Sequence, residues 1–148
     1  MDFISLSKSN RLFWLGRYYE RVALSLQYML HCYEAMTDPH RFAYAGSCPP
    51  QGIPEIHQGV EDFFQRYIFD MENPNSIRSA AELMLGNGMV LRESIGSSTL
   101  AYLQMAVYAL DEGAGGEATG LQMIEVLDNI MALRGSYDDF IADDNVRN

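Results

Sequence analysis

The sequence contains few of the residues that usually build metal, redox or disulfide sites. It has two cysteines and three histidines in 148 residues, and Cys32 and Cys48 lack the Cys-x-x-Cys spacing of redox and zinc sites. Both thiols are expected to be reduced, because disulfides are rare in cytosolic proteins. No glutamate is followed three residues later by a histidine, so the Glu-x-x-His pairs of di-iron bundles are missing. We predict no bound metal and no cofactor.

Positive charge is also scarce. Ten Lys and Arg residues against 20 Asp and Glu give a net charge of -10, which repels phosphate backbones, so we predict no nucleic-acid partner. No apolar run approaches the roughly 18 residues that span a bilayer, and the N-terminus lacks the pattern of a signal peptide. We therefore expect a cytoplasmic protein with no membrane partner.

The sequence offers no complete catalytic set. No Ser or Cys has a His and a carboxylate in a recognisable register, and the stretch from Gly113 to Gly116 lacks the Gly-Lys-Ser/Thr ending of a phosphate loop. The acidic residues Asp138, Asp139, Asp143 and Asp144 favour a solvated helix end over a magnesium-diphosphate site.

The sequence does contain helical periodicity, and no segment alternates apolar and polar residues as a strand does. We predict an all-α fold, a single bundle of about five helices forming one domain over residues 1–148. Prolines and glycines between Thr37 and His57 predict a Pro-rich loop after the first helix, with a short helix at His40 to Ala45 or a flap as alternatives. The predicted helices run from Ser7 or Ser9 to Met36, Gln58 to Phe69, Asn75 or Ser76 to Ile95, Ser97 or Ser98 to Asp111, and Glu117 to Ala142.

The first of these helices is apolar almost all the way round. One stripe is expected to face the core, and the opposite arc carries Trp14, Leu24 and Tyr28 among charged side chains. Both faces are therefore expected to contact protein, with a guanidinium-carboxylate cluster inside the bundle or at its mouth, because a charge removed from water must be paired. The core-facing residues are Leu12, Leu15, Tyr19, Val22, Leu26, Met29, Leu30 and Tyr33, with Gly16 and Ala23 beside them.

Three motifs in this order resemble the alpha-E family, bacterial all-helical proteins named for a Glu-Arg motif. They are the stretches Leu12 to Arg21, Phe69 to Ile77 and Asn87 to Ser97. The resemblance covers nearly the whole chain. It implies association with circularly permuted ATP-grasp ligases and transglutaminase-like peptidases. Relatives usually continue into a further helix. The resemblance therefore implies either a naturally short member or a truncated one, and a truncation would leave a groove where the last helix should pack.

The candidate binding residues are two Glu-Arg groups on separate helices. Arginine suits a carboxylate or phosphate because it presents a planar fork of donors. The two groups could share one cleft, with Arg78 as a neighbour unless it is solvated. The alternative is a structural ion-pair network that fixes helix register. The candidate residues are Arg17, Glu20, Arg21, Asn87, Arg92 and Glu93.

From the resemblance we expect an accessory or binding module of a peptide synthesis or modification system. Its Glu-Arg cluster would hold a peptide carboxylate or contact the ATP-grasp ligase. The competing expectation is an enzyme of the same pathway with Glu20 or Glu93 as general base. Exposure separates these interpretations, because a site must be open to solvent, whereas a structural network is buried with every donor paired.

Overall fold

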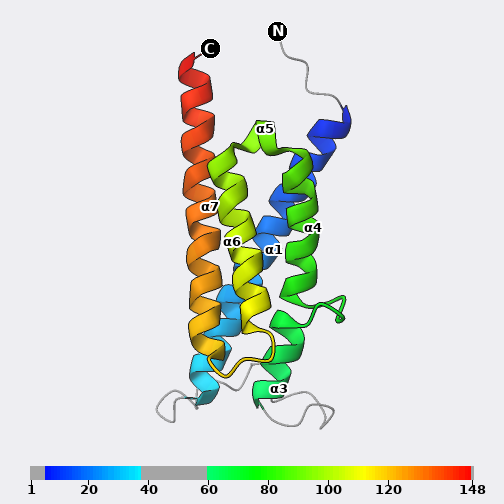
Figure 1. The fold of residues 1–148 in the computed structure, drawn as a ribbon, viewed down its shortest axis with the longest axis vertical. Coiled ribbons are helices and arrows are strands. Elements are labelled where there is room, and N and C mark those ends of the chain that lie inside the picture. The colour runs from blue at the N-terminus through cyan, green and yellow to red at the C-terminus, as the bar shows by residue number, and fades with distance from the viewer. Residues whose placement is uncertain (1–5, 38–59, 148) are drawn as a thin grey trace.

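A computed structural model of the chain describes residues 6–37 and 60–147, in which helices are present and no strand occurs. Four long helices run alternately down and up the long axis of a bundle (Figure 1), so the all-α prediction is confirmed. Helix α1 packs against α4 and α7, and α6 packs against the same two helices. The elements are α1 (Leu6–Thr37), α3 (Val60–Phe64), the π-helix η2 (Gln65–Phe69), α4 (Ile77–Val90), α5 (Arg92–Ile95), α6 (Ser97–Gly113) and α7 (Thr119–Arg147).

Helix α1 buries less of its surface than its sequence predicts. Val22, Ala23 and Leu26 are buried, and the remaining stripe residues that were predicted to face the core are half-buried. No described helix covers the opposite arc, since Trp14 is 45% exposed and Leu24 65% exposed, so the expected contact with protein on this face is not made within the bundle. An apolar pattern around a helix does not by itself show that each face has a partner.

The chain turns from η2 into α4 through polar contacts made by its own side chains. Asn73 is buried, and its Nδ2 donates to the carbonyl of Arg66 at 3.0 Å while its Oδ1 accepts from the amide of Asn75 at 3.1 Å. Ser76 caps α4, because its hydroxyl accepts from the amide of Ser79 at 3.0 Å. The predicted helix start at Asn75 or Ser76 is confirmed at Ser76.

The predicted third helix is interrupted, because Leu91 leaves helical geometry between α4 and α5. Gly96 then adopts a φ of 91°, a conformation that glycine reaches without steric cost, and α6 follows directly. No side chain caps α6, so the predicted cap by Ser97 or Ser98 is wrong, and Ser97 is its first residue. Gly88 brings α4 close to α6, since an added Cβ would lie 2.6 Å from Leu103 Cδ2.

At the other end of the bundle, Gln65 holds the loop between α6 and α7. Its Nε2 donates to the carbonyl of Gly113 at 3.0 Å, and its Oε1 accepts from the amide of Gly115 at 2.8 Å. The glycine-rich sequence predicts a flexible segment, and these two bonds give it a defined path. Gly113 also lies against Phe69, so the second family-like motif packs on this loop.

The core runs through the middle and lower part of the bundle. The helical period of the third predicted helix places one apolar stripe toward the core, and that stripe is buried throughout; its residues are Ile77, Ala80, Ala81, Met84, Gly88, Leu91 and Ile95. The helical period of the last predicted helix places Met123, Val126, Ile130 and Ile141 on its inward side. In α7 the first three are buried, whereas Ile141 is 36% exposed, so its predicted core position is wrong. The predicted Pro-rich loop and Gln58, the expected start of the second helix, lie outside the described residues. The largest fully buried side chains are Phe64, Phe69, Leu26, Ile68, Met84, Ile95, Leu103, Leu110, Met123, Ile130, Val22 and Val126.

Candidate functional site

The Glu-Arg motif lies on the exposed side of α1. Glu20-Arg21 is the one Glu-Arg dipeptide in the sequence. Arg17 Nη1 lies 3.8 Å from Glu20 Oε2, too long for a hydrogen bond, and both side chains are 63% exposed. Of the two predicted locations, inside the bundle or at its mouth, the first is therefore wrong. The helix places Arg17 and Glu20 three residues apart on one surface, where water solvates both of them.

Aromatic and aliphatic side chains flank these charges on the same side of α1. Phe13 is 59% exposed and Tyr28 is 44% exposed, and Phe13 packs edge-on against Trp14 with ring centroids 5.5 Å apart. At 100° per residue these side chains and the motif share one arc of the helix. We call this arc the α1 outer face; its residues are Phe13, Trp14, Arg17, Glu20, Arg21, Leu24 and Tyr28.

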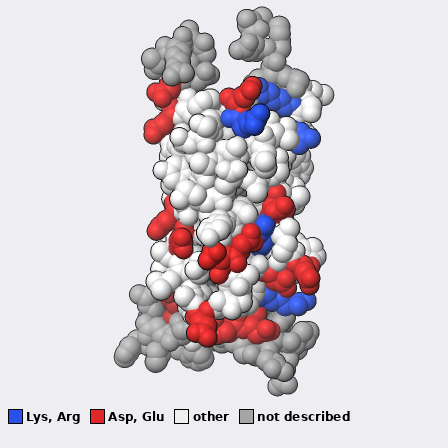
Figure 2. Space-filling model, viewed as in Figure 1, with Lys and Arg blue, Asp and Glu red and all other residues white. Residues whose placement is uncertain are grey.

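The second predicted Glu-Arg group lies elsewhere, at the end of the bundle where α1 begins. Arg92 and Glu93 of α5 line a surface hollow with Lys8 and Arg11 of α1. Figure 2 shows basic and acidic side chains together near this upper end, and mostly acidic side chains over the lower half of the face in view. The two Glu-Arg groups thus do not share a cleft. Asn87 lies beside Arg11, whose Nη1 donates to its Oδ1 at 3.4 Å.

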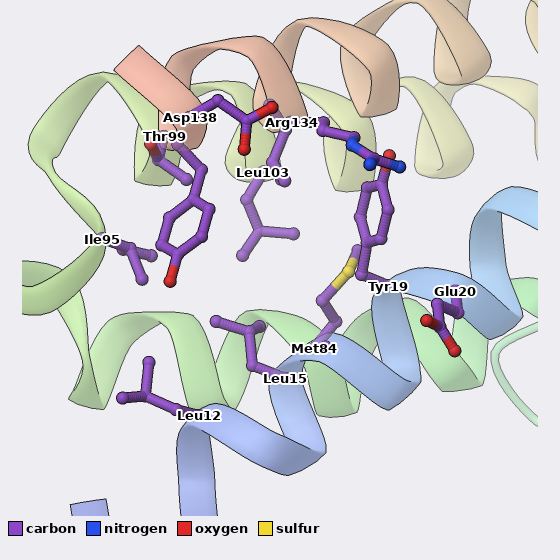
Figure 3. Close-up of a pocket in the computed structure, with 13 residues that line it drawn as sticks. Leu12, Leu15, Tyr19, Glu20, Met84, Ile95, Thr99, Leu103, Arg134 and Asp138 are labelled. Carbon is purple, nitrogen blue, oxygen red and sulfur yellow. The ribbon is translucent and has the colours of Figure 1, made fainter. Parts of the chain in front are cut away.

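A cavity of about 310 Å³, partly open to solvent, lies between the helices (Figure 3). All four long helices and α5 contribute to it, and most of its wall is aliphatic. Three charged residues that line it, Glu20 of α1 and Arg134 and Asp138 of α7, are exposed, which indicates a mouth between α1 and α7. The lining residues are Leu12, Leu15, Gly16, Tyr19, Glu20, Met84, Ile95, Thr99, Leu103, Leu133, Arg134, Tyr137 and Asp138.

Sequence reasoning missed this cavity and the role of Arg134 and Asp138 in lining it. The available signal for these two residues was their spacing of four on a helix, next to the inward-facing residues Leu133 and Tyr137. Of the predicted binding residues, Glu20 alone lines the cavity. The motif and the cavity therefore meet at Glu20.

Arg78 forms the buried ion pair that the sequence suggested for the Glu-Arg motif. Its side chain is 9% exposed; Nε donates to Asp111 Oδ1 at 2.7 Å, and Nη1 donates to Glu82 Oε2 at 2.7 Å. Burial lowers the pKa of Arg78, but the hydrogen bonds to the two carboxylates outweigh burial and raise its pKa above the ordinary value. Arg78 thus joins α4 to α6 and is neither solvated nor near the motif.

A second polar network joins α1, α3 and α7 at the lower end. The Tyr33 hydroxyl donates to Glu61 Oε1 at 3.0 Å, and the Thr119 hydroxyl donates to Glu61 Oε2 at 3.0 Å. Burial raises the pKa of Tyr33, and the hydrogen bond to Glu61 raises it further. This network ties together the described helices at that end of the bundle.

Cys32 is buried in α1 and is disulfide-bonded, so the prediction of a reduced thiol is wrong for this residue. The other cysteine of the sequence, Cys48, lies outside the described residues. Within residues 6–37 and 60–147, no three His, Cys, Asp or Glu side chains cluster as metal ligands would. In the same part of the chain, no helix has both the length and the apolarity needed to cross a membrane.

Comparison with protein-family models matches residues 7–147 to Alpha-E, described as a predicted alpha-helical domain with a conserved ER motif. The match spans every described helix except the first residue of α1. Since Glu20-Arg21 is the chain's one Glu-Arg dipeptide, we equate it with the motif in that description. No curated protein and no solved structure matches the chain.

Proposed function

Since the chain belongs to the Alpha-E family, we propose that it is a binding module of a peptide synthesis or modification system that docks an ATP-grasp-type ligase on its α1 outer face. The observation that supports this proposal most is the exposure of the motif. A pair that fixes the fold is expected to be buried, as Arg78 is, whereas Arg17 and Glu20 are 63% exposed. The ligase itself is taken from the association that the family resemblance implies.

The composition of the α1 outer face suits a protein partner. Trp, Tyr and Arg are the residues that most often dominate the free energy of binding at protein interfaces, and this face exposes Trp14, Tyr28, Arg17 and Arg21 together. A cluster of exposed apolar side chains is typical of an interaction surface.

Charge indicates what the partner should present. The chain carries a net charge of -10, yet two arginines project from this face, and Arg21 has no ion pair among the described residues. Guanidinium groups bind carboxylates through paired hydrogen bonds. The docking surface of the ligase should therefore bear acidic side chains opposite Arg17 and Arg21.

The enzymatic alternative has less support. Glu20 borders the cavity and could reach a substrate proton there, but no histidine lines the cavity. Glu93 lines the separate hollow at the end of the bundle.

The proposal is tested by calorimetric titration of this chain with an ATP-grasp-type ligase from the same genome. The variant Arg17→Gln/Arg21→Gln should bind at least about tenfold more weakly than wild type, since charged hydrogen bonds are lost at the interface. The variant Arg66→Gln/Arg92→Gln is the matched control, because it changes the net charge equally at exposed positions outside the face. It should bind within about twofold of wild type.

Two results would show that the proposal is wrong. One is the absence of binding between the wild-type chain and the ligase. The other is an equal loss of affinity in both double variants, which would indicate an effect of overall charge. If the wild-type chain binds peptides with a free carboxylate but not the ligase, and Arg17→Gln/Arg21→Gln abolishes that binding, the Glu-Arg motif is a peptide site instead.

A further inference from the structure

We propose that the cavity between α1 and α7 binds a small zwitterion with an apolar body, such as an apolar α-amino acid. This inference does not depend on docking of a ligase, because Arg17 and Arg21 do not line the cavity. The cavity and the α1 outer face are therefore testable separately.

The size and walls of the cavity suit an apolar group. The cavity has a volume of about 310 Å³ and is partly open to solvent at its mouth. Its volume falls in the range of ligand pockets, and helical bundles hold ligands between their helices. Met84, Ile95 and Leu103 are fully or almost fully buried at the inner wall, where an aliphatic or aromatic side chain would be removed from water.

The mouth of the cavity presents charges of both signs. Arg134 and Asp138 are four residues apart on α7, yet the described residues contain no ion pair that involves either of them. In Figure 3, Arg134 extends toward the side of the cavity where Tyr19 and Glu20 lie, and the carboxylate of Asp138 lies apart from the Arg134 guanidinium. A guanidinium and a carboxylate are thus both available to a ligand.

These charges determine the head group of the ligand. A carboxylate would bind the Arg134 guanidinium through charged hydrogen bonds, and an ammonium group would bind Asp138, with Glu20 as a second acidic neighbour. A purely anionic ligand would face two carboxylates, and a purely cationic ligand would face the guanidinium. A zwitterion matches both signs, which is the reason for choosing an α-amino acid.

Gly16 allows this space to be filled without disturbing the fold. It lines the cavity, and an added Cβ would meet nothing within 4 Å. Replacement by Leu improves helix propensity and places an aliphatic side chain at the cavity. Gly86 of α4 is a matched control, because its added Cβ also meets nothing within 4 Å and it does not line the cavity.

The experiment is a calorimetric titration of the full chain with L-phenylalanine and L-leucine. At least one of them should bind saturably at one site per chain. Phenethylamine, which lacks the carboxylate, and 3-phenylpropionate, which lacks the ammonium, should bind at least about tenfold more weakly than L-phenylalanine. Glycine, which lacks the apolar body, should not bind measurably. Gly16→Leu should abolish binding, Gly86→Leu should retain it, and Arg134→Gln should weaken it at least about tenfold.

Three results would overturn the inference. The first is the absence of saturable binding of both amino acids to the wild-type chain. The second is a Gly16→Leu variant that is folded, as judged by its melting curve, and still binds like wild type. The third is binding of phenethylamine or 3-phenylpropionate as tight as that of L-phenylalanine, which would show that one charge is sufficient. None of these results bears on whether a ligase docks at Arg17 and Arg21.

Discussion

Removing the two carboxylates that surround Arg78 should destabilise the bundle by more than the sum of the single changes. Asp111→Asn leaves Arg78 bonded to Glu82 and replaces one charged acceptor by a neutral one. Hydrogen bonds to charged groups contribute about 1.5–3 kcal/mol and neutral ones about 0.5–1.5 kcal/mol. Because Asp111 is itself 56% exposed, we expect a loss of about 1 kcal/mol.

The double variant Asp111→Asn/Glu82→Gln leaves a guanidinium that is 9% exposed without a carboxylate. Breaking a buried pair in this way costs about 3–5 kcal/mol. For a chain of this size the single change corresponds to a decrease in melting temperature of about 2–4 °C, and the double change to about 6–20 °C. The excess over the two single changes measures the coupling through Arg78.

Thermal unfolding followed by circular dichroism provides the measurement. Neutralising any acid also relieves repulsion in a chain of net charge -10. The control is therefore Asp128→Asn/Asp139→Asn, which removes two exposed carboxylates with no ion pair in the described residues. If this control and the Asp111/Glu82 double variant melt at the same temperature, Arg78 does not depend on its carboxylates and the reasoning is refuted.

Four further changes test local packing and titration. Gly113→Ala should lower the free energy of unfolding by about 1–3 kcal/mol through overpacking, because the new Cβ would lie 2.8 Å from Phe69 Cδ1. Gly86→Ala should instead raise it by about 0.5–1 kcal/mol, and denaturant unfolding measures both changes. Gly96→Ala should lower the melting temperature, because φ is 91° there and Phe140 Cδ2 would lie 2.8 Å from the new Cβ; a melting temperature equal to wild type would contradict the strained turn. The raised pKa of Tyr33 contributes stability that is present below pH about 10 and is lost as the pH rises through the higher folded pKa. The stability of Tyr33→Phe should therefore fall less steeply than that of wild type as the pH rises above that value. If urea unfolding gave the same dependence of stability on alkaline pH for both proteins, that would count against this contribution.

The sequence predicts the parts of the fold that depend on local pattern. The stripe Ile77, Ala80, Ala81, Met84, Gly88, Leu91 and Ile95 was predicted from period alone and is buried throughout. The Ser76 cap was also predictable, because a capping side chain and its amide lie within a few residues. Helix periodicity and capping are local properties, so one sequence is sufficient to find them.

Features that join distant helices could not be predicted in the same way. Arg78 and Asp111 are 33 residues apart, and their contact depends on how α4 crosses α6. The i,i+4 spacing of Arg78 and Glu82 was visible, but the spacing does not show whether the pair is buried. Likewise, the sequence shows that the outer face of α1 is largely apolar, but composition does not show whether another helix of the bundle covers it. The structure leaves this face exposed.

The cavity is a property of the assembled bundle. Its lining combines residues of α1, α4, α5, α6 and α7, and no single segment carries a signal for it. Glu20 was a candidate because of the motif, whereas Arg134 was not, since a lone arginine on a helix usually is a solvated surface residue. The contact between motif and cavity therefore required the structure.

The central claim, that the Glu-Arg motif is a surface for recognition and does not hold the fold together, is tested most directly by the melting temperature of Glu20→Gln/Arg21→Gln. This variant removes one charge of each sign, so the net charge stays at -10. The exposed pair that this variant breaks is Arg17–Glu20. An exposed pair contributes about 0–1 kcal/mol, so we predict a decrease of less than about 4 °C relative to wild type. A decrease of about 6 °C or more, as expected for a broken buried pair, would contradict it.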